Sequence, residues 1–266
     1  MPKAPPPSRS QIAAAIVCLA LQYGSAALAT SHAAEQDGAD SATTVASGAP
    51  SNADPDVMFH KLKANKILFL GNSITLHGPA PAIGWLGNWG MAASSKDKDY
   101  VHLVLKAIAE TAGREPQSVV ANIATFERQY ATFDVDSGLK QELAFKADLV
   151  IVAMGENVPA FTTEQAKAAF KTSTTKLLKK LKENSDPVIV VRSCFWPDQA
   201  KDTILKQACE EVGGIFVDAG ARAKDESYFA RSERQFSHAG VAAHPGDRGM
   251  KAIADAVLEA MRQNEQ

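Results

Sequence analysis

Five short runs of consecutive apolar residues constrain the fold of this chain more than any other feature. Each run is rich in Val, Ile, Leu or Phe and does not alternate with polar residues, which is typical of strands covered on both faces. The predicted strands span residues 66–70, 118–123, 148–154, 187–192 and 214–218. Stretches with helical periodicity follow at 99–112, 138–145, 163–183, 200–212 and 247–261. This alternation predicts an α/β fold, a three-layer α/β/α sandwich around a parallel five-stranded sheet.

The N-terminal thirty residues differ from the rest of the chain. Lys3 and Arg9 precede a mostly apolar run at 12–21, and small residues follow at 27–29. This order is typical of a secretory signal peptide, predicted to be residues 1–29, whereas a membrane anchor needs about twenty apolar residues. We therefore expect a periplasmic or extracellular protein without stable membrane insertion. Residues 30–56 have almost no large apolar side chains and are predicted to be a disordered linker before one folded domain, 57–266.

Charge and cysteine content narrow the class of function. The formal net charge is −2, so the chain lacks the positive field that attracts nucleic acid, and we expect no nucleic-acid partner. Only Cys194 and Cys209 remain after the predicted signal peptide is removed. A disulfide between them stays an open alternative. Two buried free thiols are favoured, because one Cys ends a predicted strand and the other lies far along the next predicted helix.

Ser73 is the candidate nucleophile. It follows the first predicted strand in a tight turn that begins at Gly71. A serine in this position needs a base within hydrogen-bond reach to take its proton, and the alternative role is that of a helix N-cap. His244, just before the last predicted helix, is the candidate base, and Asp247 is expected to cap that helix.

Asn157 is the candidate oxyanion donor. It follows the third predicted strand, and its side-chain amide can donate to a developing oxyanion, although Asn is also a common turn residue. Ligands of parallel α/β sheets bind beyond the carboxyl ends of the strands. The sequence therefore predicts that Ser73, His244 and Asn157 meet at that edge.

Three segments resemble motif blocks of a known family. Gly-Asn-Ser-Ile-Thr at 71–75, Gly-Glu-Asn at 155–157 and His-Pro-Gly-Asp-Arg-Gly-Met at 244–250 are similar to the first, third and fifth blocks of SGNH (GDSL-like) hydrolases. The resemblance covers residues 65–262. It implies a flavodoxin-like fold and ester hydrolysis through an acyl-enzyme, with no cofactor and no metal. It also implies an oxyanion hole made of the Ser73 N–H, a second-block N–H and the Asn157 amide.

Two departures from the family pattern leave alternatives open. Position 241, where the family usually has an Asp, is Val241. Either a backbone carbonyl orients His244, giving a Ser–His dyad, or a carboxylate arrives from elsewhere, with Glu127 as the leading candidate and Glu233 as a weaker one. The second block lacks its usual Gly, so Glu127 or a neighbour would supply the backbone donor. Arg128 is either a surface residue or a ligand of an anionic substrate group.

Three tryptophans suggest an aromatic substrate site. Trp85 and Trp89 lie in a long Gly-rich loop after Ser73, and Trp196 follows the fourth predicted strand. They could bind a sugar ring, or could instead pack the loop onto the domain. Together with export, they favour hydrolysis of short acyl esters, such as acetyl groups, on a carbohydrate. The alternatives are a lipase or lysophospholipase on the same scaffold, and a non-catalytic glycan-binding descendant.

Overall fold

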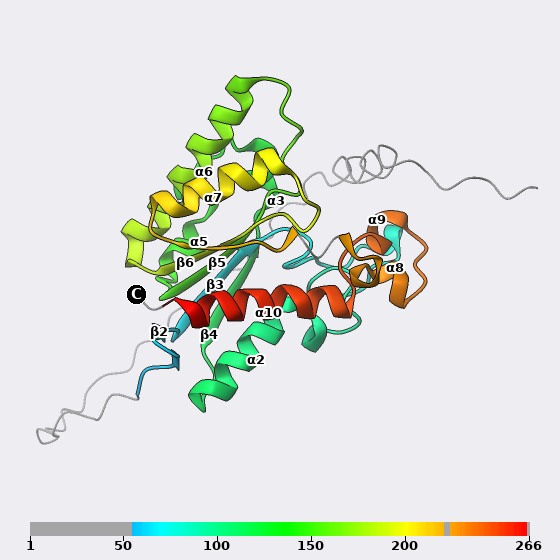
Figure 1. The fold of residues 1–266 in the computed structure, drawn as a ribbon, viewed down its shortest axis with the longest axis horizontal. Helices are drawn as coiled ribbons and strands as arrows, with labels where there is room; N and C mark the ends of the chain where they lie inside the picture. Colours follow the sequence, from blue (N-terminus) through cyan, green and yellow to red (C-terminus); the bar gives the residue numbers. More distant parts are fainter. Residues whose placement is uncertain (1–54, 221–223, 265–266) are drawn as a thin grey trace, which may run out of the picture. The chain divides into compact units, whose positions relative to one another are not determined.

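A parallel five-stranded sheet lies at the centre of the computed structural model, which describes residues 55–220 and 224–264 (Figure 1). The predicted signal peptide and nearly all of the predicted linker lie outside the described residues. The strand order is β4-β3-β5-β6-β7, and every neighbouring pair is parallel. The strands are β3 Lys66–Gly71, β4 Gln117–Asn122, β5 Leu149–Ala153, β6 Val188–Arg192 and β7 Ile215–Val217. The predicted fold class is confirmed.

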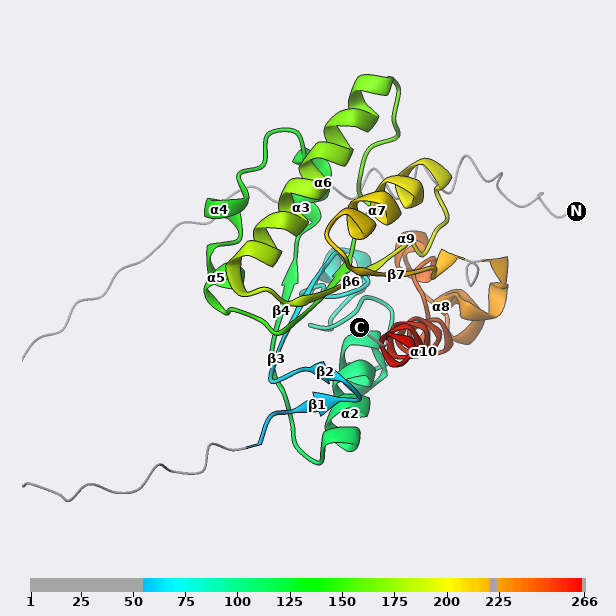
Figure 2. The same ribbon diagram turned by 60° about the vertical axis from the view of Figure 1, so that its left-hand side comes forward.

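Helices cover both faces of this sheet, as Figures 1 and 2 show from two directions. One face carries α2 (Tyr100–Ala112) and α10 (Asp247–Gln263), and the other carries α6 (Glu164–Ser185) and α7 (Gln199–Glu211). Successive side chains of a strand point to opposite faces. Ile67 and Phe69 of β3 therefore join the apolar core under α2 and α10, whereas Leu68 and Leu70 join the core under α6 and α7.

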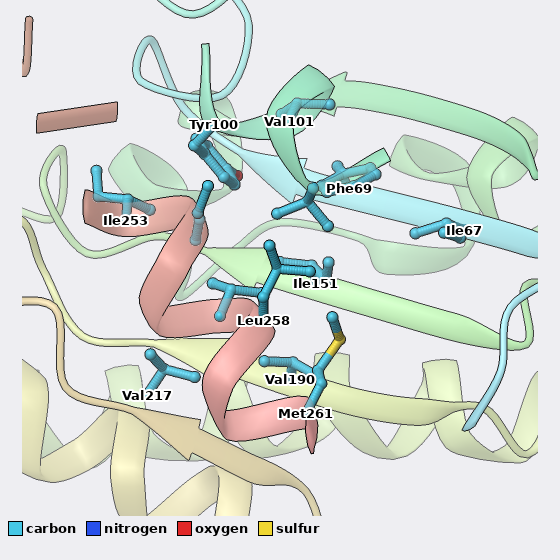
Figure 3. Packing of buried hydrophobic residues seen from close by; sticks show 14 of the residues in the cluster. Ile67, Phe69, Tyr100, Val101, Ile151, Val190, Val217, Ile253, Leu258 and Met261 are labelled. Carbon is cyan, nitrogen blue, oxygen red and sulfur yellow. The ribbon is translucent and has the colours of Figure 1, made fainter. Parts of the chain in front are cut away.

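The core under α10 joins residues far apart in the sequence. Ile67, Phe69, Ile151 and Val190 come from three adjacent strands, and Figure 3 shows them beneath side chains of the last helix. All of these strand residues are buried. Each fully buried side chain of this size contributes about 1.5–3 kcal/mol relative to an exposed one. This packing fixes the carboxyl ends of the strands, where the predicted site residues lie.

Short elements connect the layers. The predicted helix 138–145 is instead two shorter helices, because the backbone of Leu139 leaves the helical region between them. β1 and β2 form an antiparallel pair beside α2. The short elements are β1 Met58–Phe59, β2 Leu62–Lys63, η2 Pro81–Ile83, η3 Lys96–Lys98, α3 Ala124–Gln129, α4 Val135–Gly138, α5 Lys140–Ala144, η5 Glu226–Tyr228, α8 Ala230–Glu233 and α9 Ala239–Ala242.

A third, smaller apolar cluster lies apart from the two faces of the sheet. It joins the long loop after β3 to the segment of α8 and α9. Its buried members, called the loop cluster below, are Ala80, Trp85, Met91, Ala92, Ala230 and Val241. Cys194 and Cys209 are both buried free thiols, as the sequence favoured. Within 55–220 and 224–264, no helix combines the length and apolarity needed to span a membrane.

Candidate active site

Ser73 lies in the turn directly after β3, two residues beyond the end of the strand. The turn is closed by the N–H groups of Thr75 and Leu76, which both donate to the Asn72 carbonyl at 2.9 Å. A Cβ atom at Gly71 would overlap the Thr75 side chain, so only glycine lets the chain fold back here. Thr75 is in turn bound to the Tyr100 hydroxyl of α2 at 2.8 Å. The turn is therefore fixed and keeps Ser73 partly exposed at the sheet edge.

The imidazole of His244 reaches this serine from the other end of the chain. Its Nε2 lies 2.8 Å from Ser73 Oγ, and its Nδ1 lies 2.7 Å from the Gly240 carbonyl oxygen. A carbonyl can only accept, so Nδ1 carries the hydrogen and Nε2 is free to accept the serine proton. The predicted meeting of Ser73 and His244 is thus present, and the backbone alternative for orienting the imidazole is the one observed.

The surroundings of His244 keep it neutral. Burial lowers the pKa of the imidazole to about 4, because it outweighs the hydrogen bond to Gly240, which acts in the opposite direction. The nearby His77 and His238 lower this pKa further. Trp196 packs edge-on against the imidazole, with ring centroids 5.3 Å apart and an interplanar angle of 89°. A neutral imidazole is the form that can act as a general base.

Glu127 does not fill either of its predicted roles. Its fully buried carboxylate accepts hydrogen bonds from Asn72, Gly155 and Asn157, and none from His244. Its backbone N–H donates to the Ile123 carbonyl at 3.2 Å in the first turn of α3, so it is not free to bind an oxyanion. Both predictions for Glu127 were wrong, because the carboxylate points under the sheet edge toward the loops after β3 and β5.

Glu233, the weaker candidate acid, is also wrong for that role. Its carboxylate accepts from the N–H groups of Asp247 and Arg248 at 2.7 and 2.8 Å, so it caps α10. Asp247, the expected cap, instead accepts from the Ser94 N–H and hydroxyl. Val241, at the position of the family's Asp, is buried in the loop cluster. In the described residues the only hydrogen-bond partner of His244 Nδ1 is the Gly240 carbonyl.

A polar network lies beneath the site at the ends of β3, β5 and β6. The Asn72 amide nitrogen donates to Glu127 at 3.2 Å and to Glu156 at 2.7 Å, and Asn157 Nδ2 donates to Glu127 at 2.9 Å. Arg192 pairs with Glu156 at 2.8 Å, and both side chains are almost fully buried. These five residues, Asn72, Glu127, Glu156, Asn157 and Arg192, are called the polar network below.

The two carboxylates of the polar network differ in their charge environment. Burial, and next the charge of Glu156, raise the pKa of Glu127. Burial also acts to raise the pKa of Glu156, but the Arg192 guanidinium and the Phe195 N–H overcome it, and this pKa is lowered. Glu156 is therefore the ionised partner of Arg192. Burying charges of this kind is expensive unless they are paired, and here every carboxylate oxygen has an N–H partner.

Sequence reasoning missed three members of this network, namely Asn72, Glu156 and Arg192. Two of them stand beside predicted site residues, inside the Gly-Asn-Ser and Gly-Glu-Asn segments. The signal for Arg192 is a charged residue at the end of an otherwise apolar buried strand, Val188–Arg192. A charge at such a place needs a buried partner. The sequence did not show which carboxylate that partner would be.

The tryptophans are placed differently from one another. Trp85 is buried in the loop cluster, donates to the His77 carbonyl at 3.0 Å and packs edge-on against Trp89. Its predicted substrate contact is therefore wrong, since its ring packs the loop onto the domain. Trp89 is half-buried and donates to the Ala93 carbonyl. Trp196 is half-buried against His244, which places it at the site. Arg128 is exposed on α3.

The described residues offer few ligands for a metal. Between residues 55 and 220 and between 224 and 264, no group of three or more His, Cys, Asp or Glu side chains is arranged to hold a metal ion.

The backbone N–H of Ser73 donates to no other residue in this described part of the chain. Ser73, His244 and this N–H thus form a base-assisted nucleophile with a donor beside it.

Comparison with known proteins supports the fold. No protein-family model matches the chain, and no curated protein matches it in sequence. Among solved structures, a predicted GDSL-like lipase from Parabacteroides merdae ATCC 43184 has a TM-score of 0.51 and 18% identity, over 78% of this chain and 99% of that chain.

A second similar structure is a two-domain esterase active on acetylated mannans, crystallised with mannopentaose. It has a TM-score of 0.52 and 15% identity, over 74% of this chain and 49% of that chain, so this chain matches about half of it. Identities this low show a shared fold and no more. The described part of this chain therefore has the α/β fold of GDSL-like hydrolases and carbohydrate esterases.

Proposed function

We propose that this chain is an exported SGNH-type serine hydrolase that removes short acyl groups, such as acetyl, from carbohydrates. The observation that carries the proposal is the 2.8 Å contact between Ser73 Oγ and His244 Nε2, with the opposite ring nitrogen bound to a carbonyl. A serine with a neutral imidazole at this distance can be deprotonated during attack. The support for a glycan ester is the fold shared with an esterase that acts on acetylated mannans.

The reaction follows from this geometry in two halves. Ser73 Oγ attacks the ester carbonyl while its proton passes to His244 Nε2, and the carbonyl oxygen becomes an oxyanion bound by the Ser73 N–H and the Asn157 amide. The bond to the alcohol then breaks, and the alcohol leaves with the proton from His244. Water, deprotonated by His244, attacks the acyl-enzyme and releases the carboxylic acid, and the proton returns to Ser73.

The dyad needs no carboxylate partner for His244 in this scheme. The role of such a partner is to hold the imidazole in the right tautomer and orientation. The Gly240 carbonyl performs this role, because it accepts from Nδ1 at 2.7 Å. What a neutral carbonyl does not supply is a negative charge to stabilise the imidazolium that forms in the transition state. We therefore expect a slower enzyme than one with a buried aspartate.

Replacing the nucleophile tests the proposal directly. Ser73→Ala and His244→Ala should each lower kcat on p-nitrophenyl acetate by about 10⁴-fold or more, because the two groups act as one unit. A fluorophosphonate should label Ser73 in the wild-type chain, detected by mass spectrometry. Ser118→Ala is the matched control, since this serine is exposed on the edge strand β4. Unlabelled Ser73 together with full activity of Ser73→Ala would refute the assignment.

The substrate class needs a separate experiment. Activity should be highest on acetyl esters and should fall as the p-nitrophenyl acyl chain lengthens from acetate to palmitate. Acetylated mannan and acetylated xylan should release acetate, measured by an enzymatic acetate assay. A preference for palmitate would instead support the lipase alternative, which fits the GDSL-like lipase of the same fold.

A further inference from the structure

The Glu127 carboxylate is the one buried acid of the polar network without a cationic partner. Arg192 neutralises Glu156, whereas all groups that bind Glu127 are neutral N–H donors. The Ser73–His244 pair does not use this carboxylate, which makes no hydrogen bond to His244. Burial of a charge in this way is unfavourable by several kcal/mol unless its hydrogen bonds compensate. The arrangement calls for a role beyond packing.

The contacts of Glu127 join the two loops that would bind an oxyanion. One carboxylate oxygen accepts from Asn157 Nδ2 at 2.9 Å. The other accepts from the Gly155 N–H at 2.5 Å, the Asn157 N–H at 3.2 Å and the Asn72 amide at 3.2 Å. Gly155 and Asn157 belong to the loop after β5, and Asn72 precedes Ser73 after β3. A single side chain of α3 therefore fixes both loops relative to each other.

The orientation of the Asn157 amide follows from this bond. An amide nitrogen carries two hydrogens in a plane, about 120° apart. When Glu127 holds one of them, the direction of the second hydrogen and of the side-chain oxygen is set. An amide that flipped by 180° would place its oxygen against the Glu127 carboxylate, which is repulsive. Among the described residues no second acceptor binds Asn157 Nδ2, so its other hydrogen can be donated to an oxyanion.

We propose that Glu127 is a positioning residue for the oxyanion hole, which holds the Asn157 amide with a donor toward the reacting carbonyl and ties it to the turn of Ser73. The inference rests on the proposed hydrolase function and adds a residue to it. Four N–H donors surround this side chain, so an acceptor with two oxygens fits and a glutamine does not. Its NH₂ group would face at least one of these donors.

The Glu156 carboxylate holds the Asn72 amide together with Glu127. The two hydrogens of the Asn72 amide are divided between Glu127 and Glu156. Glu156 is held by Arg192 and by the Phe195 N–H at 2.8 Å. Glu127 thus binds Asn72, and the other hydrogen of the Asn72 amide is bound by Glu156, which is ion-paired with Arg192. The residue next to the nucleophile cannot move without breaking bonds to both acids.

A double-mutant cycle on Glu127 and Asn157 tests the inference. Asn157→Ala should lower kcat on p-nitrophenyl acetate by about 10²–10³-fold, the usual effect of losing one oxyanion donor. Glu127→Gln should lower kcat by about 10–100-fold with KM changed less than about 3-fold, because the Asn157 donor that Glu127 positions binds the oxyanion only in the transition state. In the Asn157→Ala background, Glu127→Gln should lower kcat by no more than about 3-fold further.

Several results would overturn the inference. If the two losses multiply in the double variant, Glu127 acts independently of Asn157. An unchanged kcat in Glu127→Gln would show that Glu127 does not position the donor, and an unchanged kcat in Asn157→Ala would show that Asn157 is not an oxyanion donor; either result overturns the inference. If the wild-type chain neither hydrolyses p-nitrophenyl acetate nor reacts with a fluorophosphonate, the proposed function fails and the inference fails with it. If the wild-type chain is active but the two decreases in kcat are independent, only the inference about Glu127 fails and the proposed function stands.

A measurement on the wild-type chain guards against variants that do not fold. In a ¹⁵N-resolved NMR spectrum, one of the two Asn157 Nδ2 protons should be shifted downfield and should exchange slowly with solvent, because Glu127 accepts its hydrogen bond. If both Nδ2 protons had the chemical shifts and solvent-exchange rates of an exposed Asn amide, the inference would be contradicted without any substitution. Glu127→Asp, which keeps the charge but withdraws it by one methylene, should lower kcat in the same direction and is a second variant for the cycle.

Discussion

The two sides of this site hold their functional groups by different means. On one side, the polar network fixes Asn72 and Asn157 with hydrogen bonds to buried carboxylates. On the other side, the Gly240 carbonyl binds the His244 imidazole and Trp196 packs edge-on against it, while the apolar loop cluster holds α9, the segment just before His244. An amide donor must be oriented in a plane, which needs directional bonds. An imidazole needs one acceptor on Nδ1, and non-directional packing can supply the rest of its position.

The polar side should be the more sensitive to a single substitution. Arg192→Met removes the charge that compensates Glu156, and both groups are buried. Breaking one partner of such a pair leaves an uncompensated buried charge, so we expect the free energy of unfolding to fall by about 3–5 kcal/mol. Urea denaturation followed by circular dichroism measures this change.

Two further variants make the Arg192 prediction specific. Arg192→Met combined with Glu156→Gln should recover part of the lost stability, because the unpaired charge is gone. Lys251→Met removes one partner of an exposed pair with Asp255 on α10 and should have little effect. A loss for Arg192→Met no larger than that for Lys251→Met would show that the buried ion pair contributes nothing.

On the apolar side, an acid at position 241, where SGNH hydrolases usually have an Asp, should destabilise the folded chain. Val241→Asp inserts a carboxyl group into the loop cluster, where Val241 is 1% exposed. We expect the free energy of unfolding to fall by at least about 2 kcal/mol, with no gain in kcat, because Nδ1 is already bound to Gly240. Val241→Ala is the control for loss of packing alone. A rise in kcat for Val241→Asp would mean that the carboxylate reaches the imidazole.

The smallest expected effect is a shift in pH dependence. Burial lowers the pKa of His244 to about 4 from an ordinary value of 6.5. The neutral base should therefore persist to lower pH than usual, so kcat/KM should stay near its plateau at pH 6 and be halved near pH 4. The unfolded chain binds this proton more readily, so the stabilising contribution of neutral His244 is complete above about pH 6.5 and is lost as the pH falls toward 4.

The pH prediction is checked with two observables. The pH profile of kcat/KM reports the free enzyme, and an NMR titration of the His244 ring protons assigns the change to this residue. A midpoint near 6.5 in both would show that the imidazole is less desolvated than its surroundings indicate. A midpoint near 6.5 in the profile alone would point to another titrating group.

The sequence predicted the strands and the Ser73–His244 contact for a common reason. Buried parallel strands leave continuous apolar runs, and the loops after them must meet at one sheet edge. Ser73 and His244 were visible because each stands beside a well-marked element, β3 and α10. The wrong expectations concern side-chain direction. The Glu127 carboxylate binds N–H groups of the loop after β5, and the Glu233 carboxylate binds N–H groups at the start of α10.

Local pattern alone predicted the fold class and placed Ser73 and His244 beside β3 and α10, because periodicity and glycine placement act over a few residues. Tertiary structure decided which acceptor orients His244, which carboxylate holds Asn157 and which tryptophan reaches the site. Gly240 lies only four residues before His244, but Asn157 lies thirty residues beyond Glu127, and Trp196 comes from the loop after β6. The last two choices therefore depend on distances between separate elements of the fold. Only the packed core of the sheet and its helices sets such distances.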